Sequence, residues 1–413
     1  MAARRPWLSF FAGEAVSTSC SITPATEAGF AGPPYHQPTW SSRSKSRERL
    51  GRFPLKEKLL ARGRAWQRHT DRMGLLRTAA SGFDVAIVRF VQQIGRGRPP
   101  PYADRLARLG QTAATYQSIS PKAFFAEPPM PRISERWVRG LHDGGEVVDL
   151  TWTSGWVPHD VAGRKDYLAF EENRIAHARL LRHAHRAPVI VCLHGYRAGV
   201  HRLEEVAWRA RWLYGRLGLD VALVTLPFHA RRSPRGRFAP VFPSMRTART
   251  VEGFGQAVWD VRALMAWLRA RGAPRLGVAG MSLGGYTAAL LSTVDPRLDW
   301  VVLFIPLADL TDVTFEHEAM RGEQIPEPLR DAGKRALQLV RPLARTPLVP
   351  GERMLVVAAE GDRITAKHTH AERLAAHFGA PLVAFPGGHL LQFGRRAGLR
   401  AMERLIRVQV ARP

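Results

Sequence analysis

The stretch RLGVAGMSLGGYTAALL, residues 275–291, decides the fold. Its first half is a short apolar run typical of a buried strand, and its second half is a run of small and apolar residues that favours a helix. Between the two halves, Gly280-Met281-Ser282-Leu283-Gly284 has the form G-x-S-x-G. After a strand and before a helix, this pattern places a serine hydroxyl on a sharp turn at the sheet's carboxyl edge. We therefore predict that Ser282 is a nucleophile, with a purely structural turn serine as the alternative.

Short apolar runs recur on both sides of this stretch, and helical stretches separate most of them. Runs rich in Val, Ile and Leu are typical of strands buried on both faces, and their alternation with helices predicts a doubly wound, mostly parallel sheet. We expect this α/β catalytic domain over residues 145–413, with residues 308–350 forming a lid-like insertion. The runs are 147–155, 187–195, 219–227, 299–306, 353–361 and 380–388.

The N-terminal third differs in composition from the rest. Residues 1–50 are rich in Ser, Thr, Pro, Gly and Arg without periodicity, which predicts a disordered basic tail. Residues 51–144 carry helical apolar spacing, with two helices expected on either side of Ser81-Gly82 and another over 102–116. We expect a helical N-terminal extension, and the sequence does not indicate its role.

The strand, the G-x-S-x-G turn and the helix together resemble the α/β-hydrolase superfamily over roughly residues 145–413, nearest to its dienelactone-hydrolase and prolyl-oligopeptidase-like branches. Members carry a serine, an acid and a histidine in that order, the acid after a late strand and the histidine after the last. Here Asp362 directly follows one late run and His389 directly follows the last. The resemblance implies that Asp362 orients His389, which acts as general base toward Ser282.

Other residues compete for two of these positions. Asp309 and Asp312 follow the run 299–306, where some hydrolases place the acid, although Asp is also favoured as a helix N-cap. We favour Asp362 because it follows the strand that precedes the His389 strand. The histidines of a helix predicted over 366–378 compete for the base, and for them we expect packing or surface roles; they are His368, His370 and His377.

An oxyanion hole needs two backbone N–H donors aimed at the developing charge. One would be Leu283, directly after the nucleophile. By the same resemblance the other is Tyr196, in the turn His194-Gly195-Tyr196, with Arg197 as the neighbouring alternative. His194 is expected to brace this turn.

The segment LPFHARR, residues 226–232, resembles the loop after the next strand in many members of the superfamily. Ala230 stands there where glycine is expected. His229 and Arg231, with Arg232 beside them, are candidates for binding the substrate. Solvated surface charge is the alternative for these arginines.

The composition limits which classes of binding partner and cofactor are expected. The net charge is +26, but 54 of the 61 basic residues are arginines spread along the whole chain, so nucleic acid is not expected. Peripheral contact with a membrane stays open, and the oligomeric state is not indicated. The distant Cys20 and Cys192 exclude a disulfide framework, and no ligand-spaced cluster such as H-E-x-x-H occurs, so we expect neither metal nor cofactor. Without an apolar run of membrane length, we expect a cytoplasmic protein.

These observations predict a serine hydrolase that cleaves a small-molecule carboxylic ester, or less readily an amide or peptide bond, through an acyl-enzyme. Two other classes remain. The first is a non-catalytic relative that uses the fold for binding, although such proteins usually lose a member of the triad and here all three are present. The second is a basic surface-binding protein in which the Arg-rich N-terminus attaches to membrane or RNA.

Overall fold

The computed structural model describes residues 74–86, 100–235, 240–313 and 324–412. The chain divides into two compact units, Met1–Lys58 and Leu59–Pro413. The first unit, which includes the predicted disordered tail 1–50, lies outside the described residues, so the description below concerns the second unit alone. Within the described ranges, no helix combines the length and apolar character needed to cross a membrane.

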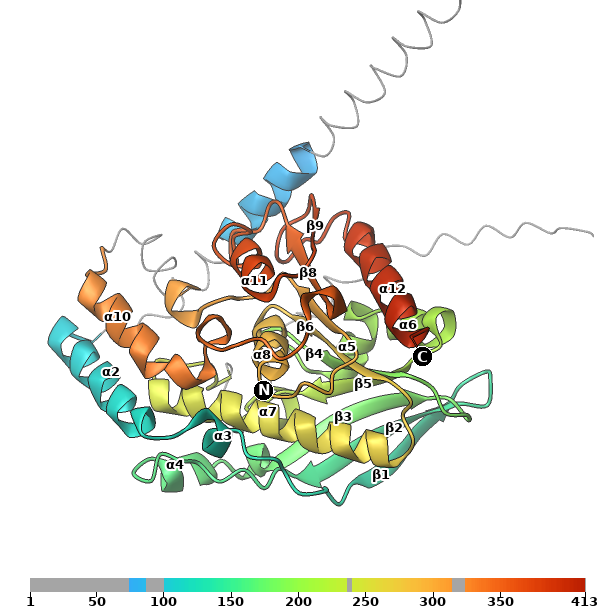
Figure 1. Ribbon diagram of the computed structural model, residues 1–413, viewed down its shortest axis with the longest axis horizontal. Helices are drawn as coiled ribbons and strands as arrows, with labels where there is room; N and C mark the ends of the chain where they lie inside the picture. The colour runs from blue at the N-terminus through green and yellow to red at the C-terminus, as the bar shows by residue number, and fades with distance from the viewer. Residues whose placement is uncertain (1–73, 87–99, 236–239, 314–323, 413) are drawn as a thin grey trace, which may run out of the picture. The chain divides into compact units, whose positions relative to one another are not determined.

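A nine-stranded sheet forms the centre of this unit, in the order β1-β2-β3-β5-β4-β6-β7-β8-β9. The six strands from β5 to β9 in this order are mutually parallel, whereas β1, β2 and β3 extend the sheet in antiparallel pairing beyond β5. The predicted doubly wound, mostly parallel sheet is thereby confirmed (Figure 1). The strands are β1 Ser134–Gly140, β2 Glu146–Thr153, β3 Ile175–Arg182, β4 Val189–Leu193, β5 Asp220–Thr225, β6 Leu276–Met281, β7 Val301–Phe304, β8 Met354–Ala359 and β9 Leu382–Phe385.

Helices cover both faces of the sheet, because the parallel strands carry buried side chains on both faces. On β4, Val189, Val191 and Leu193 join one apolar core, whereas Ile190 and Cys192 join the other. The first core is closed by α7 (Thr247–Ala270), α8 (Leu283–Ser292) and α11 (Ala371–Phe378). The second is closed by α6 (Ala210–Leu217), which follows α5 (His201–Ala207), and by α12 (Arg396–Val410).

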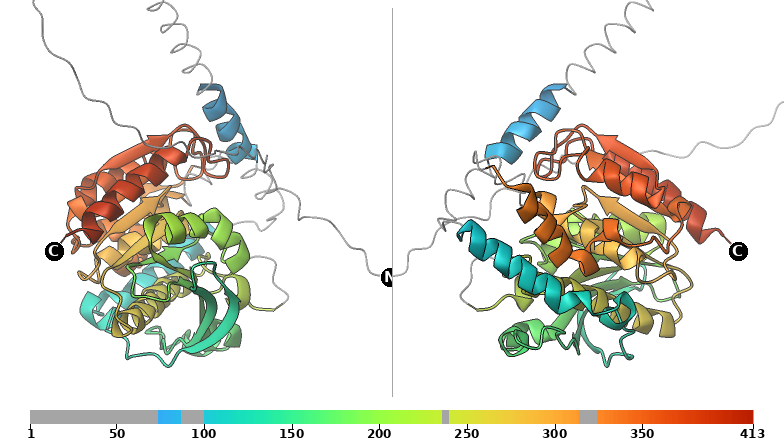
Figure 2. Two further views of the ribbon diagram at one scale, coloured as in Figure 1. Left: turned by 90° about the vertical axis from the view of Figure 1, so that its right-hand side faces the viewer. Right: turned by 60° about the vertical axis from the view of Figure 1, so that its left-hand side comes forward.

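The segment 51–144 contributes both helices and a strand. Residues 74–86 form one helix that runs through Ser81 and Gly82, so the predicted break there is wrong. The helix predicted over 102–116 is α2 (Tyr102–Gln117), and it packs against α10 (Glu327–Ala336) (Figure 2). Because β1 also belongs to this segment, the sheet begins before residue 145. The unit also has shorter helices: α3 Pro121–Phe124, α4 Arg164–Leu168, and 3-10 turns at Glu171–Arg174, Ala230–Arg232, Gln338–Val340, Pro342–Ala344 and Gly351–Arg353.

Candidate active site

Ser282 occupies the turn between β6 and α8, with a backbone φ of 53° and ψ of −112°. A positive φ is uncommon for a residue with a side chain and persists only where the surroundings enforce it. Glycines make that possible here by close packing. A Cβ on Gly280 would lie 2.0 Å from the Gly284 carbonyl oxygen, and one on Gly284 would lie 2.0 Å from the Leu193 carbonyl oxygen. The turn is therefore wedged against the end of β4.

A continuous hydrogen-bonded chain joins Ser282, His389 and Asp362. His389 Nε2 lies 2.9 Å from Ser282 Oγ, and His389 Nδ1 lies 2.8 Å from Asp362 Oδ2. All three residues are largely buried, with exposed fractions of 8% for Ser282, 9% for His389 and 4% for Asp362. Since the carboxyl ends of β6, β8 and β9 meet at one edge of the sheet, residues up to 107 positions apart come into contact.

The Asp362 carboxylate is held by its own loop. Oδ1 accepts from the backbone N–H groups of Ile364 at 2.8 Å and Thr365 at 2.7 Å. The Thr365 hydroxyl donates to Oδ2 at 2.8 Å and lies 3.1 Å from His389 Nδ1. Thr365 was not foreseen from the sequence, and its spacing of three residues from Asp362 is the only local signal for it.

Asp362 and His389 each shift the pKa of the other in the direction that favours its charged form. Burial by itself would raise the pKa of Asp362, but the charge of His389 and hydrogen bonds from His389 and Thr365 outweigh it and hold this pKa below its ordinary value. Burial by itself would lower the pKa of His389, but the charge and hydrogen bond of Asp362, with a smaller contribution from Asp84, raise it above 6.5. This arrangement favours a carboxylate beside an imidazole that readily takes up a proton.

The competing carboxylates have other partners. Asp309 is fully buried, pairs with Arg341 at 2.7 Å and accepts from the Thr311 backbone N–H at 2.9 Å, as an N-cap does. Asp312 pairs with Arg373. Neither contact involves His389.

The competing histidines are likewise engaged elsewhere or exposed. The helix predicted over 366–378 begins only at Ala371, so His368 and His370 precede it. His370 is buried, and its Nδ1 accepts from the Ala308 backbone N–H at 3.2 Å. His377 Nε2 lies 2.9 Å from the Arg345 carbonyl oxygen, and His368 is exposed.

Two turns border Ser282 where oxyanion donors were expected. Leu283 is the first residue of α8, where backbone N–H groups have no acceptor within the helix. A Cβ on Gly195 would lie 3.6 Å from Ser282 Cβ, so the turn that carries Tyr196 stands next to the serine. Arg197, the alternative donor, has a left-handed φ of 62° in the same turn.

His194 holds this turn in place. Its Nε2 accepts from the Leu226 backbone N–H at 3.0 Å, so Nδ1 carries the proton and donates to the Gly195 carbonyl oxygen at 2.7 Å. Burial lowers the pKa of His194 well below its ordinary value, which keeps the ring neutral. The ring thus joins the loop after β4 to the end of β5.

The candidate substrate-binding residues lie apart from the serine's cavity. His229 is fully buried, its Nδ1 lies 2.8 Å from the Pro227 carbonyl oxygen, and burial lowers its pKa to about 4. Arg231 is exposed. Arg232 is fully buried and donates to Asp260 at 2.8 Å, so it is a structural ion pair of the core. Neither His229 nor Arg231 lines the cavity at Ser282.

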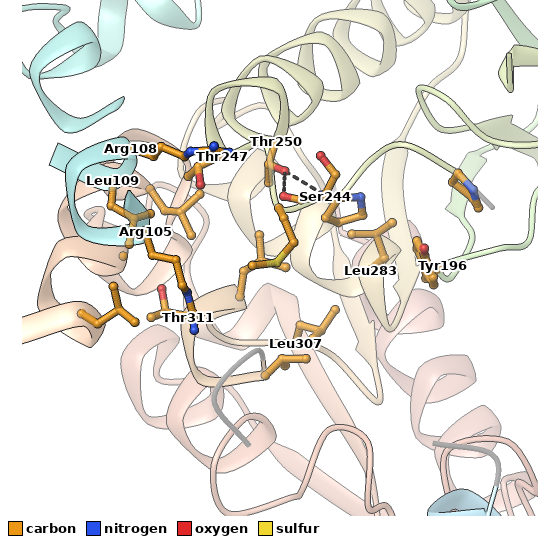
Figure 3. Close-up of a pocket in the computed structure, with 18 of the residues that line it drawn as sticks. Arg105, Arg108, Leu109, Tyr196, Ser244, Thr247, Thr250, Leu283, Leu307 and Thr311 are labelled. Carbon is orange, nitrogen blue, oxygen red and sulfur yellow. Dashed lines mark hydrogen bonds between the residues drawn. The ribbon is translucent and has the colours of Figure 1, made fainter. Parts of the chain in front are cut away.

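A cavity of about 610 Å³ opens at Ser282. Its wall is mainly apolar, and its polar part includes serine and threonine hydroxyls together with Arg105 and Arg108 of α2 (Figure 3). In Figure 3, Tyr196 and Leu283 lie at one side and Leu109 of α2 at the other. The lining includes Leu109, Tyr196, Pro243, Met245, Thr250, Leu283, Leu307, Leu310, Val313, Leu329 and Leu337.

Of two segments that line this cavity, only one was expected at the site from the sequence. The segment 308–350 contributes lining residues on both sides of the undescribed residues 314–323, and its role as a mobile lid stays a prediction. The contribution of α2 was not foreseen, because nothing local connects residues 102–117 with Ser282. In the ranges that the structure describes, no group of three or more His, Cys, Asp or Glu side chains is placed to hold a metal ion.

Comparison with known proteins places this site in context. Residues 171–318 match the family described as "Alpha/beta hydrolase domain containing 18". Two uncharacterized proteins of Mycobacterium tuberculosis, from the strains CDC 1551 / Oshkosh and ATCC 25618 / H37Rv, are each 35% identical over 279 residues. The match covers 65% of this chain and 66% of each relative, just under two thirds of their length.

Solved structures are similar at low sequence identity. Acetyl xylan esterase 1 from Thermoanaerobacterium sp. JW/SL YS485 has 15% identity and a TM-score of 0.49, with 76% of this chain and 95% of that chain covered. The acetyl xylan esterase from Paenibacillus sp. R4 has 15% identity and a TM-score of 0.48, with coverage of 76% and 96%.

Proposed function

We propose that this chain, whose residues 171–318 match an alpha/beta hydrolase domain family, is a serine hydrolase that cleaves carboxylic esters through an acyl-enzyme. The single observation that carries the proposal is the contact chain from Ser282 Oγ through His389 to Asp362. A serine hydroxyl is a weak nucleophile until a base within hydrogen-bond reach takes its proton. In the proposed mechanism His389 is that base, and Asp362 orients it.

Each residue then has a defined task. Ser282 Oγ attacks the ester carbonyl while its proton passes to His389 Nε2, and the resulting imidazolium is stabilised by Asp362. The oxyanion is bound by the backbone N–H groups of Leu283 and Tyr196, and each such donor contributes about 3–4 kcal/mol in the transition state. His389 then protonates the departing alcohol, which leaves an acyl group on Ser282. Water, activated by the same imidazole, releases the acid.

The cavity indicates the kind of ester. A volume of about 610 Å³ is far larger than an acetyl group needs, and the wall is mainly apolar. Burying additional methylene groups against such a wall stabilises the bound ester by about 0.8 kcal/mol each. We therefore propose an ester with a medium-length or bulky apolar acyl group as substrate.

A chain-length series of p-nitrophenyl esters tests this function. The wild-type protein is expected to release p-nitrophenol from medium-chain esters faster than from the acetate, and Ser282→Ala is expected to lose turnover by several orders of magnitude while remaining folded. Thermal unfolding of both proteins controls for folding. Equal turnover by wild type and Ser282→Ala would contradict the proposal, whereas a preference for anilides over esters would redirect it to amides.

A further inference from the structure

The helix over residues 74–86 inserts a buried carboxylate between the loops that follow β8 and β9. Asp84 is fully buried, as is Ala80 one turn before it. Asp84 Oδ2 accepts from the backbone N–H of His389 at 2.8 Å and from that of Arg363 at 3.3 Å. Asp84 Oδ1 accepts from the backbone N–H of Leu390 at 3.1 Å. One carboxylate thus joins the loop of Asp362 to the loop of His389.

These contacts fit a carboxylate rather than any side chain of similar size. Both oxygens of Asp84 accept from N–H donors; burial raises the pKa of Asp84 above its ordinary value, and the hydrogen bonds from the His389 and Leu390 backbone oppose that rise. Burying a charge is costly unless hydrogen bonds compensate it, and within the described ranges no cationic side chain pairs with Asp84. The backbone N–H groups of His389, Leu390 and Arg363 supply such hydrogen bonds, which makes the geometry of the two loops and the charge of Asp84 dependent on each other.

The surrounding residues are built for this close approach. A Cβ on Gly388 would lie 2.7 Å from Asp84 Oδ2 and 3.1 Å from Ala80 Cβ, so the loop reaches the helix only where it has no side chain. The Ser81 hydroxyl donates to the Gly361 carbonyl oxygen at 2.8 Å, which is a second link to the loop of Asp362. The helix is thus fitted to the loops at several points.

We propose that Asp84 is a positioning residue, which fixes the backbone of His389 so that the imidazole stays between Asp362 and Ser282. The inference rests on the proposed function, in which His389 is the general base. Asp362 aligns the imidazole through its side chain, and Asp84 aligns the same residue through its backbone. A displacement of about 1 Å at a reacting group can cost about 100-fold in rate, so loosening this backbone lowers turnover without touching the substrate.

Asp84 also acts on His389 by its charge. Among the described residues, the charged groups that face the imidazole are Asp362 and Asp84, and both raise the pKa of His389. Neutralising Asp84 removes one of these two contributions. The pH at which His389 loses its proton should therefore fall, a result that a role in packing alone would not produce.

The test compares Asp84→Asn, which keeps the shape of the side chain, with Asp84→Ala and with Asp295→Asn as matched control. Asp295 is a buried carboxylate that accepts from the Arg297 backbone N–H at 3.0 Å and, unlike Asp84, also pairs with the Arg297 guanidinium at 2.8 Å; it follows the end of α8 remote from Ser282. Asp84→Asn is expected to lower kcat about 10- to 100-fold with little change in KM and to move the acid limb of the pH profile to lower pH. Asp295→Asn is expected to keep the wild-type kcat and pH profile.

Amide hydrogen exchange of the peptide covering residues 386–393 gives a readout independent of turnover. Exchange at His389 and Leu390 should be faster in both Asp84 variants and unchanged in Asp295→Asn. The inference would be overturned if Asp84→Asn kept the wild-type kcat, the wild-type acid limb of the pH profile and the wild-type exchange rate of this peptide. If Asp84→Ala fails to fold, Asp84→Asn alone is the test. Absence of Ser282-dependent turnover in the wild type would instead contradict the proposed function, while faster exchange in Asp84→Asn would still support the anchoring of the loop.

Discussion

At the scale of single residues, the candidate site combines a serine with a strained backbone and a histidine that is held on two sides. The positive φ of Ser282 carries a cost of about 1–3 kcal/mol, which the packing of Gly280 and Gly284 sustains. His389 contacts Ser282 through one ring nitrogen and Asp362 through the other. The strain and the contacts together keep the Ser282 hydroxyl oriented toward His389 Nε2.

The acid can be identified by substitution. Asp362→Asn should lower kcat by about 10³- to 10⁴-fold, because the amide favours the wrong tautomer of His389 and does not stabilise the imidazolium form. Asp309→Asn should leave kcat within about threefold, since Asp309 pairs with Arg341, and should instead lower the unfolding temperature. Ester kinetics and thermal unfolding of both variants check this. A large loss of kcat in Asp309→Asn with normal kcat in Asp362→Asn would reverse the assignment.

The pH dependence of kcat/KM follows from the raised pKa of His389. General-base catalysis needs the neutral imidazole, so activity should be lost as the pH falls below this pKa. Because Asp362 and Asp84 raise the pKa above 6.5, the acid limb should lie above that value and move to lower pH in Asp362→Asn. Initial rates in buffers of constant ionic strength measure it. Activity that stays constant down to about pH 5 would contradict a histidine base with a raised pKa.

Residues tied to a local pattern were predictable, and those supplied by distant segments were not. Ser282 follows from G-x-S-x-G, and His389 and Asp362 follow from their places after strands. The backbone bond from His389 to Asp84 joins residues 305 positions apart, and no sequence pattern announces it. Thr365 was missed because a hydroxyl after an acid has many local uses.

At the scale of elements, the two strands that were missed both carry arginines: β1 is largely exposed, whereas Arg179 of β3 is buried by pairing. The runs 147–155 and 187–195 are apolar and were recognised, but β1 and β3 contain arginines that do not resemble core residues. Arg179 of β3 is buried because it pairs with Asp149 of β2 at 2.7 Å and with Glu205 at 2.8 Å. An apolar-run criterion cannot detect a strand of this kind.

The wall formed by α2 and α10 should set the acyl length that the cavity accepts. Leu109→Trp on α2 should lower kcat/KM for an octanoyl ester about tenfold or more while sparing the acetyl ester, because the larger ring fills space that only the long chain uses. Ala107→Trp is the matched control, since Ala107 is an exposed residue of the same helix outside the cavity lining. Equal losses for both esters in Leu109→Trp would show that the acyl chain lies elsewhere.

At the scale of the whole molecule, some of the 61 basic residues are buried in ion pairs of the core. Arg232 is fully buried and pairs with Asp260 at 2.8 Å, and Arg179 is buried with its own partners. Each of these arginines is neutralised by a buried carboxylate, so it forms no surface for nucleic acid. The number of arginines therefore overstates how many can contact a polyanion, whereas the net charge is unaffected by such pairs.

Truncations should separate the N-terminal tail from the helix that carries Asp84. Removal of residues 1–45 is expected to leave ester turnover within about twofold, because their composition cannot support a packed core. Removal of residues 1–86 is expected to lower turnover strongly, because it deletes Asp84 and Ser81 with their contacts to the loops of His389 and Asp362. Kinetics and circular dichroism of both forms check this. Full activity after removal of residues 1–86 would show that the helix that carries Asp84 is dispensable.

The central claim is that Ser282 is the nucleophile of a serine hydrolase, and covalent labelling tests it most directly. A fluorophosphonate probe reacts with an activated serine, and peptide mass spectrometry identifies the residue that it modifies. The account predicts labelling of Ser282 in the wild type, much slower labelling in His389→Ala, and none in Ser282→Ala, with all three proteins folded. Labelling of Ser282→Ala at the wild-type level, or an unmodified Ser282 in an active wild-type protein, would contradict the account.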